Sequence, residues 1–229
     1  DVVRDVKRFR TRSGSVKLNI ALSELPSFPA WDVADGDVHK GLVATSPSVE
    51  YLERAWDDAK YGRMSEHPYL EAVFPTAHEP QGLAPKGKHV MLGFSQYGPY
   101  ELGEGSWDDG GREEYARRAL KALGEFAPGL EDLVEEMEVL APKDIEERFG
   151  LIGGNIMQGE LTPDQMFSFR PIPNYGDYRS PIAGMYLCGS GTHPGGGVMG
   201  VPGRNAASVV LRDHKRGEFI DRVKNFGRS

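Results

Sequence analysis

Residues 184–211 read GMYLCGSGTHPGGGVMGVPGRNAASVVL, and this stretch decides the fold class of the chain's C-terminal part. The apolar residues 185–188 predict a short buried strand that ends at Gly189. Because glycine tolerates positive φ, the glycines from Gly189 to Gly197 allow the backbone to approach a ligand closely. Apolar spacing from about residue 199 to residue 215 then predicts a helix. Free N–H groups and the helix dipole at its start favour an anion or an electron-rich carbonyl group.

Several familiar glycine motifs do not fit this stretch. A phosphate-binding P-loop needs a lysine, and none occurs between residues 184 and 211. In the register that begins Gly189-x-Gly191, the dinucleotide motif G-x-G-x-x-G fails because Pro194 occupies the position of its third glycine. A hydrolase that uses Ser95 or Ser190 is disfavoured, since neither serine lies in a G-x-S-x-G elbow.

The rest of the chain predicts a mixed fold of strands and helices. Alternating or apolar runs predict strands at residues 15–22, 69–74 and 88–96. Helical spacing predicts one helix from Ser46-Pro47 to about residue 61 and a second at 112–126, the latter capped by Asp109. Shorter helical pieces are expected as far as residue 149, and a capping box at residues 162–165 predicts another short helix. The expected class is therefore α/β in the mixed α+β sense.

Composition and charge exclude some functions. The chain has 229 residues with 39% hydrophobic and 27% charged residues, which is typical of a folded globular protein. No run approaches the roughly 18 to 20 apolar residues of a membrane helix, so no integral membrane segment is expected. The net charge of -7 disfavours nucleic acid as a partner. The single cysteine, Cys188, excludes an intrachain disulfide and is interpreted as packing at the end of the buried strand.

Two charged stretches are interpreted as exposed. The first is basic and is expected to be a solvated linker: Arg4, Lys7, Arg8, Arg10 and Arg12. The second is acidic and is expected to be a solvent-facing surface: Glu131, Asp132, Glu135, Glu136 and Glu138.

Residues 184–211 closely resemble the C-terminal flavin motif of the phytoene-desaturase-like flavoproteins. Within them, residues 189–197 look most like the group of the pyridine nucleotide-disulphide oxidoreductase domain-containing protein 2. The likeness continues upstream through Gly153-Gly154-Asn155, Arg170-Pro171 and Asp177-Tyr178-Arg179. The family builds an FAD domain from two separated pieces, with a sheet-based substrate domain between them. Residues 1–150 are therefore expected to be mainly the substrate-binding domain, and residues 151–229 the C-terminal strand-loop-helix segment of the FAD-binding domain.

The resemblance implies FAD as cofactor and the transfer of hydride from a small apolar substrate to the flavin, in a dehydrogenase or desaturase type of reaction. N–H groups near the helix start would stabilise the charge that develops on the flavin. The family holds the adenine and pyrophosphate of FAD with an N-terminal βαβ unit, and this chain shows no such unit. An N-terminal FAD-binding half is therefore expected as its partner, and the chain alone is expected to be inactive. The residues expected to contact the cofactor are Gly189, Ser190, Gly191, His193, Gly196, Gly197, Val198 and Met199.

No catalytic residue is identified, and three candidates each have a structural alternative. Arg170 could bind a substrate carboxylate or polarise the flavin, or it could form a structural ion pair. Gln165 could face the pocket or cap a helix, and His193 is more readily a loop-ordering residue than an acid or base. Tyr175 and Tyr178 could line a substrate entrance or pack. The other histidines lack metal-ligand spacing, so no metal site is expected.

An alternative from another class is a non-catalytic binding or protein-interaction module that does not hold FAD on its own. A homodimer is left open. The expected compartment is the cytoplasm in a bacterium, or the mitochondrial matrix in a eukaryote.

Overall fold

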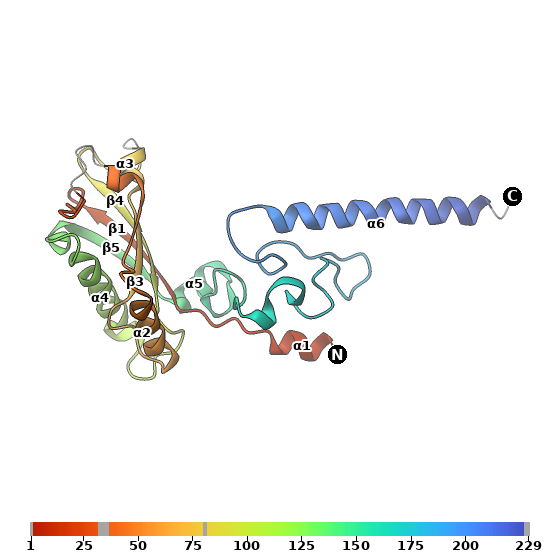
Figure 1. Cartoon of the computed structure of the whole chain (residues 1–229), viewed down its shortest axis with the longest axis horizontal. Coiled ribbons are helices and arrows are strands. Elements are labelled where there is room, and N and C mark those ends of the chain that lie inside the picture. The colour runs from red at the N-terminus through yellow and green to blue at the C-terminus, as the bar shows by residue number, and fades with distance from the viewer. Residues whose placement is uncertain (1, 32–36, 80–81, 227–229) are drawn as a thin grey trace. The chain divides into compact units, whose positions relative to one another are not determined.

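The computed structural model describes residues 2–31, 37–79 and 82–226, and the chain divides into two compact units (Figure 1). Unit 1 consists of Asp1–Arg12 and Ile156–Ser229, and unit 2 consists of Ser13–Asn155. The chain thus leaves unit 1 after its first residues and returns to it for its C-terminal part. The names substrate-binding domain and FAD-binding segment remain predictions for these units.

Unit 2 is built on an antiparallel five-stranded sheet with the order β2-β3-β4-β1-β5. The strands expected at residues 15–22, 69–74 and 88–96 are confirmed as β1 (Ser15–Leu22), β3 (Tyr69–Val73) and β4 (His89–Gln96). The sequence did not predict β2 (Leu42–Ala44) or β5 (Val134–Leu140). β5 carries most of the acidic stretch, and its glutamates are exposed as that interpretation requires. The mixed fold class is confirmed.

Helices cover one face of this sheet. α4 (Arg112–Gly124) buries Tyr115, Ala119 and Leu123 against the alternate residues of β1 that begin with Val16. The other α-helices of the unit are α2 (Val49–Lys60), α3 (Pro75–His78) and α5 (Pro142–Phe149). Short helical turns join these elements: η1 (Asp37–Lys40), η2 (Trp107–Gly111), η3 (Leu130–Leu133) and η4 (Ile152–Gly154).

Two expected helix starts are wrong in detail. α2 is capped by Ser48, whose hydroxyl accepts the N–H of Tyr51, and not by Ser46. Its apolar side residues Val49 and Trp56 remain exposed, and Ala55 alone is buried in this helix. Asp109 does not cap α4, because its backbone is non-helical and the helix begins after Gly111.

Unit 1 has few regular elements: α1 (Val2–Arg8), the turns η5 (Pro163–Gln165) and η6 (Phe167–Phe169), and α6 (Val201–Phe226). The helix expected from residue 199 is confirmed as α6, which begins at Val201. The strand expected at residues 185–188 does not form. A single bridge joins Tyr186 to Arg179, since no described strand runs alongside to extend the pairing.

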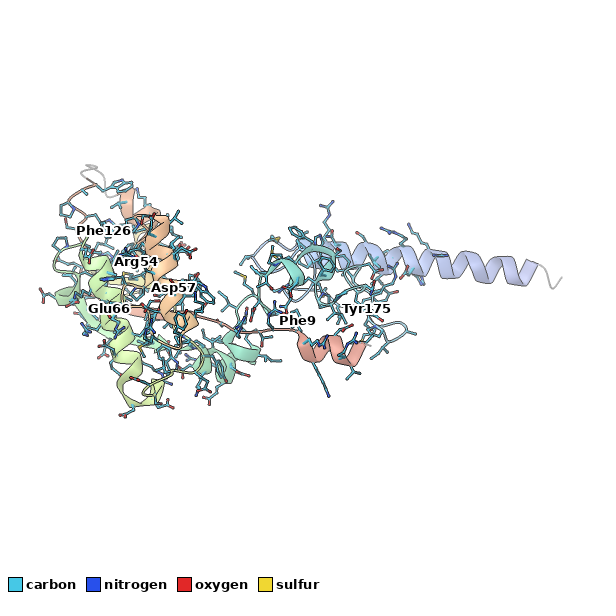
Figure 2. The ribbon with its side chains drawn as sticks, turned by 60° about the horizontal axis from the view of Figure 1, so that its bottom comes forward. Phe9, Arg54, Asp57, Glu66, Phe126 and Tyr175 are labelled. Atoms are coloured by element: carbon cyan, nitrogen blue, oxygen red, sulfur yellow. The ribbon has the colours of Figure 1, made fainter. Side chains whose placement is uncertain are left out.

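The basic N-terminal segment is not a solvated linker, because two of its arginines are fixed in unit 1. Figure 2 shows the side chains of the chain, with Phe9 of this segment labelled. Nε of Arg10 lies 3.0 Å from Glu160, and its Nη2 lies 2.8 Å from Asp164. Nε of Arg12 lies 2.6 Å from Glu160. The carboxylates that neutralise these cations lie about 150 residues away in sequence, so the basic pattern alone could not reveal them.

Candidate functional site

The glycine loop of residues 189–200 is anchored at its start by a buried arginine. The side chain of Arg170 is fully buried, and its Nε and Nη2 donate to the carbonyl oxygen of Ser190 at 3.0 and 2.8 Å. Nη2 also donates to the carbonyl oxygen of Met157. Burial lowers the pKa of Arg170. No carboxylate of the described residues lies within ion-pair distance, so backbone carbonyls alone satisfy this cation.

These contacts bear on both structural and catalytic interpretations of Arg170. The structural ion pair that the sequence left open is not formed among the described residues. The guanidinium also lies 6.0 Å from the ring centroid of Phe9, which gives it a cation–π contact. Since its donors face carbonyl oxygens, Arg170 is arranged to hold three chain segments together. A direct catalytic role remains a prediction.

Gln165 binds the N-terminal segment through two hydrogen bonds. Its Oε1 accepts the backbone N–H of Arg10 at 2.7 Å, and its Nε2 donates to the carbonyl of the same residue at 3.0 Å. The side chain is buried, and the two bonds fix the orientation of the amide. Gln165 therefore neither caps a helix nor faces a pocket, because both ends of its amide bond the backbone of Arg10. The expected capping box is also absent, because Thr162 Oγ1 accepts a hydrogen bond from the side chain of Arg10 instead.

Tyr178 holds the middle of the glycine loop. Its hydroxyl donates to the carbonyl oxygen of His193 at 2.9 Å and accepts from Nδ2 of Asn205 at 2.8 Å. The side chain is buried and packs with Ala206 and Val209 of α6. Of its two expected roles, the structure supports packing. Tyr175 makes no such link, since no described group hydrogen-bonds its hydroxyl.

His193 carries an unsatisfied polar atom. Its Nδ1 is buried and has no hydrogen-bond partner among the described residues. Buried polar atoms without partners are rare in native proteins, so such an atom requires an explanation. It is compatible with a ligand or another polypeptide that approaches the loop at this point.

A second ionic link ties the preceding loop to α6. Arg179 donates from Nε and Nη2 to the two carboxylate oxygens of Asp213, at 2.8 and 2.7 Å. The hydroxyl of Tyr186 donates to the same carboxylate at 2.9 Å. Hydrogen bonds from Arg179, and then from Tyr186, lower the pKa of Asp213. Arg170, Tyr178 and Arg179 thus fix the chain on both sides of the loop.

The last part of the loop is exposed. Gly197 and Gly200 have φ values of 124° and 67°, which favour glycine. Val198 is fully exposed and Met199 is half-exposed. The N–H of Met199 donates to the carbonyl oxygen of Gly197 at 3.0 Å, so it is not the free donor that the sequence suggested. The N–H groups of Gly197 and Val198 have no partner within the described ranges.

Of the remaining expected contacts, Gly189 is exposed, whereas Gly191 and Gly196 are half-buried. Gly189 has a φ of 92°, and its carbonyl oxygen accepts the hydroxyl of Thr192 at 2.9 Å. A Cβ at Gly191 would lie 3.6 Å from Oε1 of Gln158. A Cβ at Gly196 would lie 2.4 Å from the sulfur and 3.2 Å from Cα of Met157, so a side chain at this position would displace Met157. Cys188 is exposed, contrary to its interpretation as buried packing, because the buried strand that it was expected to end does not form.

Sequence reasoning missed two residues of this network on α6. Asn205 and Asp213 are eight residues apart and flank Val209, so all three lie on one helix face. The sequence did contain a signal for them, since Asn205 and Asp213 are polar residues at helical spacing on the face that also carries the buried Ala206. The sequence could not indicate their partners, Tyr178 and Arg179, because those lie in a loop without a periodic pattern.

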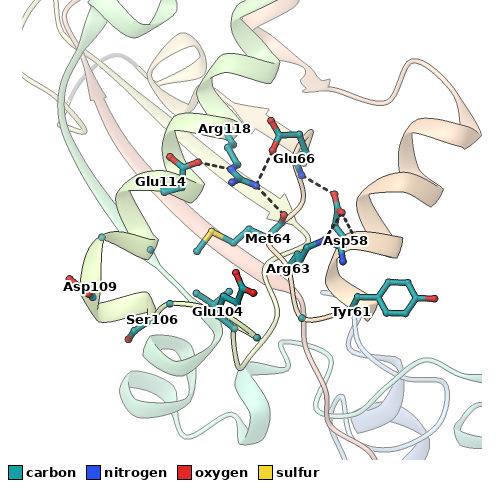
Figure 3. A pocket seen from close by; sticks show the side chains of 16 residues that line it. Asp58, Tyr61, Arg63, Met64, Glu66, Glu104, Ser106, Asp109, Glu114 and Arg118 are labelled. Carbon is teal, nitrogen blue, oxygen red and sulfur yellow. Dashed lines mark hydrogen bonds and ion pairs between the residues drawn. The ribbon is translucent and has the colours of Figure 1, made fainter.

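Unit 2 contains a pocket of about 660 Å³ beside the turn that follows α2 (Figure 3). Its charges are largely paired, since Arg118 bonds Glu114 at 2.7 Å and Arg63 bonds Asp58 at 2.9 Å. None of the residues expected to bind the cofactor lines it. Within the described ranges, no group of three or more His, Cys, Asp or Glu side chains could hold a metal ion. No described helix is long and apolar enough to span a membrane.

Comparison with known proteins shows related oxidoreductases. No family model matches the chain. The chain is 42% identical over 219 residues to the pyridine nucleotide-disulfide oxidoreductase domain-containing protein 2 of Rattus norvegicus, which covers 93% of the chain and 38% of that protein. It is 30% identical over 167 residues to the 4,4'-diapophytoene desaturase of Staphylococcus haemolyticus, which covers 71% of the chain and 32% of the desaturase.

A third relative extends this similarity. The phytoene desaturase (neurosporene-forming) of Rhodobacter capsulatus is 29% identical over 168 residues, with 73% of the chain and 31% of the desaturase covered. The chain therefore spans about a third of the length of the curated relatives it matches. The resemblance inferred from residues 153–211 is confirmed, and by sequence the chain belongs with the phytoene-desaturase-like oxidoreductases, in the group of the pyridine nucleotide-disulfide oxidoreductase domain-containing protein 2.

Proposed function

We propose that the chain is part of an FAD-dependent oxidoreductase of the dehydrogenase or desaturase type, and that unit 1 forms the wall against the isoalloxazine ring. The observation that carries this proposal is the glycine loop, which is fixed at Ser190 and His193 and exposed from Gly197 to Gly200. Oxidoreductases are found among the relatives, including two desaturases. The remaining FAD contacts are assigned, as part of the proposal, to sequence that the relatives have and this chain does not span.

The residues present fit a flavin ring in three respects. The free N–H groups of Gly197 and Val198 can donate to a carbonyl oxygen or an electron-rich nitrogen. The exposed side chains of Val198 and Met199 offer an apolar surface to a flat ring. The buried, unpaired Nδ1 of His193 offers a further hydrogen-bonding atom.

In the proposed mechanism, FAD supplies an acceptor for the hydride that leaves the substrate. The N–H groups of Gly197 and Val198, which precede α6, favour negative charge near them without an added charged side chain. Arg170 keeps the base of the loop in place, and its positive charge is directed to backbone carbonyls. Val198 and Met199 would exclude water from the ring face. The substrate is proposed to be small and mainly apolar.

A flavin titration tests this proposal. FAD is added to the purified chain and, in parallel, to a longer protein that also contains the sequence its relatives have and it lacks. Binding is followed by flavin absorbance and by quenching of FAD fluorescence. Stoichiometric binding by the longer protein is expected. The flavoenzyme proposal is abandoned if the longer protein is folded and binds no flavin.

A second candidate is a non-catalytic binding or protein-interaction module. It is favoured by the small core of unit 1, where the buried cluster consists of Tyr178, Ala206 and Val209. Apolar side chains of the same unit are exposed, among them Phe167 and Ile182. Exposed apolar surface commonly marks an interface with another polypeptide. Failure of both proteins to bind flavin, with a stable complex recovered between unit 1 and another polypeptide, would support this second function.

A further inference from the structure

The sheet of unit 2 has a second face, opposite the helices that cover the first. Successive residues of a strand point to opposite faces of the sheet. In β1, Val16, Leu18 and Ile20 are buried under the helices, and Lys17 and Asn19 therefore lie on the second face. Lys17, Asn19 and Ala21 of β1 are half-buried on this face, as are their neighbours in β4. This face is called the open face below.

The open face is apolar around one lysine. The strand register places Lys17 between Phe94 of β4 and Leu140 of β5. In the next rows, Leu92 lies opposite Asn19, and Val90 lies opposite Ala21. The side chain of Lys17 therefore lies beside a row of aliphatic and aromatic groups along β4, on a face that also carries glutamates of β3 and β5.

The ammonium of Lys17 is held close to the sheet. Its Nζ lies 3.3 Å from the carbonyl oxygen of Leu18 and 3.3 Å from that of Gly93. Burial lowers the pKa of this group. No carboxylate of the described part of the chain lies within ion-pair distance. A lysine with two carbonyl acceptors retains a third N–H for another partner.

None of the described carboxylates on the open face lies within ion-pair distance of Lys17. Glu71, which shares a row with Phe94 and Lys17, accepts the hydroxyl of Tyr69. Glu138 accepts Nδ2 of Asn19 at 2.8 Å and Nη1 of Arg148 at 2.6 Å. Glu136 lies opposite Ala21 on the edge strand and is exposed. The positive charge of Lys17 is therefore not neutralised by direct contact.

We propose that the open face binds a ligand with an apolar body and a single carboxylate, and that Lys17 pairs with this carboxylate. Apolar contacts with Phe94, Leu92 and Val90 would hold the body. One ammonium matches one negative charge, whereas a phosphate dianion would leave excess charge beside Glu71 and Glu138. If the proposed function holds, this ligand is the substrate, and the inference gives that substrate an acidic end.

The test compares two ligands that differ in the head group. Dodecanoate, kept below its critical micelle concentration, and dodecanol are titrated into the whole chain by calorimetry. Wild type should bind dodecanoate about ten-fold more tightly than dodecanol, as one charge-assisted contact allows. Lys17→Met should abolish this preference and leave dodecanol affinity unchanged, whereas Lys17→Arg should retain the preference.

Lys121→Met is the matched control, because it removes the same charge from the exposed side of α4. It should leave the preference for dodecanoate intact. The proposal is overturned if wild type binds neither ligand, if it binds both equally, or if Lys17→Met keeps the preference. Flavin titration of the same proteins separates this outcome from the proposed function, because a failure to bind FAD would leave the carboxylate result unaffected.

Discussion

Arg170 is hydrogen-bonded to Ser190 through two donors: its Nε and Nη2 both donate to the serine's carbonyl oxygen, at 3.0 and 2.8 Å. Because the guanidinium is planar and fully buried, this contact fixes the direction as well as the position of the Ser190 peptide. Ser190 lies at the start of the glycine loop. The conformation of the proposed flavin wall therefore depends on a charge that itself faces away from solvent.

Arg170→Met should destabilise unit 1 by about 2–4 kcal/mol, because the partly buried carbonyl oxygens of Ser190 and Met157 lose a charged donor. Urea denaturation measures the loss, and hydrogen exchange should show faster exchange near both segments. Arg204→Met, which removes an exposed arginine of α6, should change stability little. Equal stability of the two variants would contradict the role given to Arg170.

Tyr178→Phe removes one hydroxyl that both donates to His193 and accepts from Asn205. We expect a loss of about 1–2 kcal/mol in the free energy of unfolding, since two partly buried polar groups lose their partner. Tyr175→Phe is the control, because the hydroxyl of Tyr175 has no partner among the described groups. If both variants exchange the amides of residues 191–197 at the wild-type rate, Tyr178 does not order the loop.

Gly197→Ala should weaken flavin binding at least about ten-fold, since its φ of 124° is rarely adopted by residues with a Cβ. The added Cβ would also lie 2.8 Å from Cε of Met199. Gly203→Ala serves as the control, because its Cβ would meet nothing within 4 Å and alanine favours the helix. The titration is made in the form of the protein that binds FAD, with circular dichroism to establish folding. Unchanged affinity in Gly197→Ala would remove this glycine from the site.

The stability of unit 1 should depend on pH through Asp164. A hydrogen bond from Arg10 holds the pKa of Asp164 at about 2, below its ordinary value. A carboxylate with a lowered pKa in the folded state contributes stability above its unfolded pKa, near 4, and this is lost as pH falls toward 2. Thermal unfolding of wild type and Asp164→Asn should therefore differ at pH 7 and converge near pH 2. A constant difference across this range would exclude the ionic contribution.

Gly93→Ala should destabilise unit 2 by about 1–3 kcal/mol, because the new Cβ would overpack the core. It would lie 3.0 Å from Cβ of Leu18 and 3.1 Å from Cδ1 of Leu70. Gly124→Ala, at the end of α4, meets nothing within 4 Å and should be neutral or stabilising by up to about 1 kcal/mol. Both values follow from urea denaturation. A Gly93→Ala variant as stable as wild type would show that the packing around β4 can expand.

The elements that could be predicted from the sequence are those whose pattern records a buried face. β1 alternates strictly and α4 repeats its apolar residues every three to four positions, so both were recognised. β5 was missed, because its glutamates point outward from an edge strand and obscure the alternation. Residues 185–188 illustrate the converse, since an apolar run forms a strand only where another strand pairs with it.

For the candidate site, the sequence identified several of the important residues but did not indicate which groups they contact. Arg170, Gln165 and His193 all lie in the network that shapes the glycine loop. Their partners are largely backbone atoms, and every residue carries the same backbone groups. Periodicity and charge pattern therefore contain no signal for such contacts.

The bond between Gln165 and Arg10 has a consequence for the order of folding. The two residues are 155 positions apart, and the whole of unit 2 lies between them. If the segment between them is unfolded, bringing its ends together lowers the conformational entropy of the chain before stabilising contacts can form. Unit 2 has short-range hairpin and helix contacts of its own, such as the pairing of β3 with β4. It should therefore fold first and shorten the effective separation, so that unit 1 is assembled late and depends kinetically on the domain inserted into it.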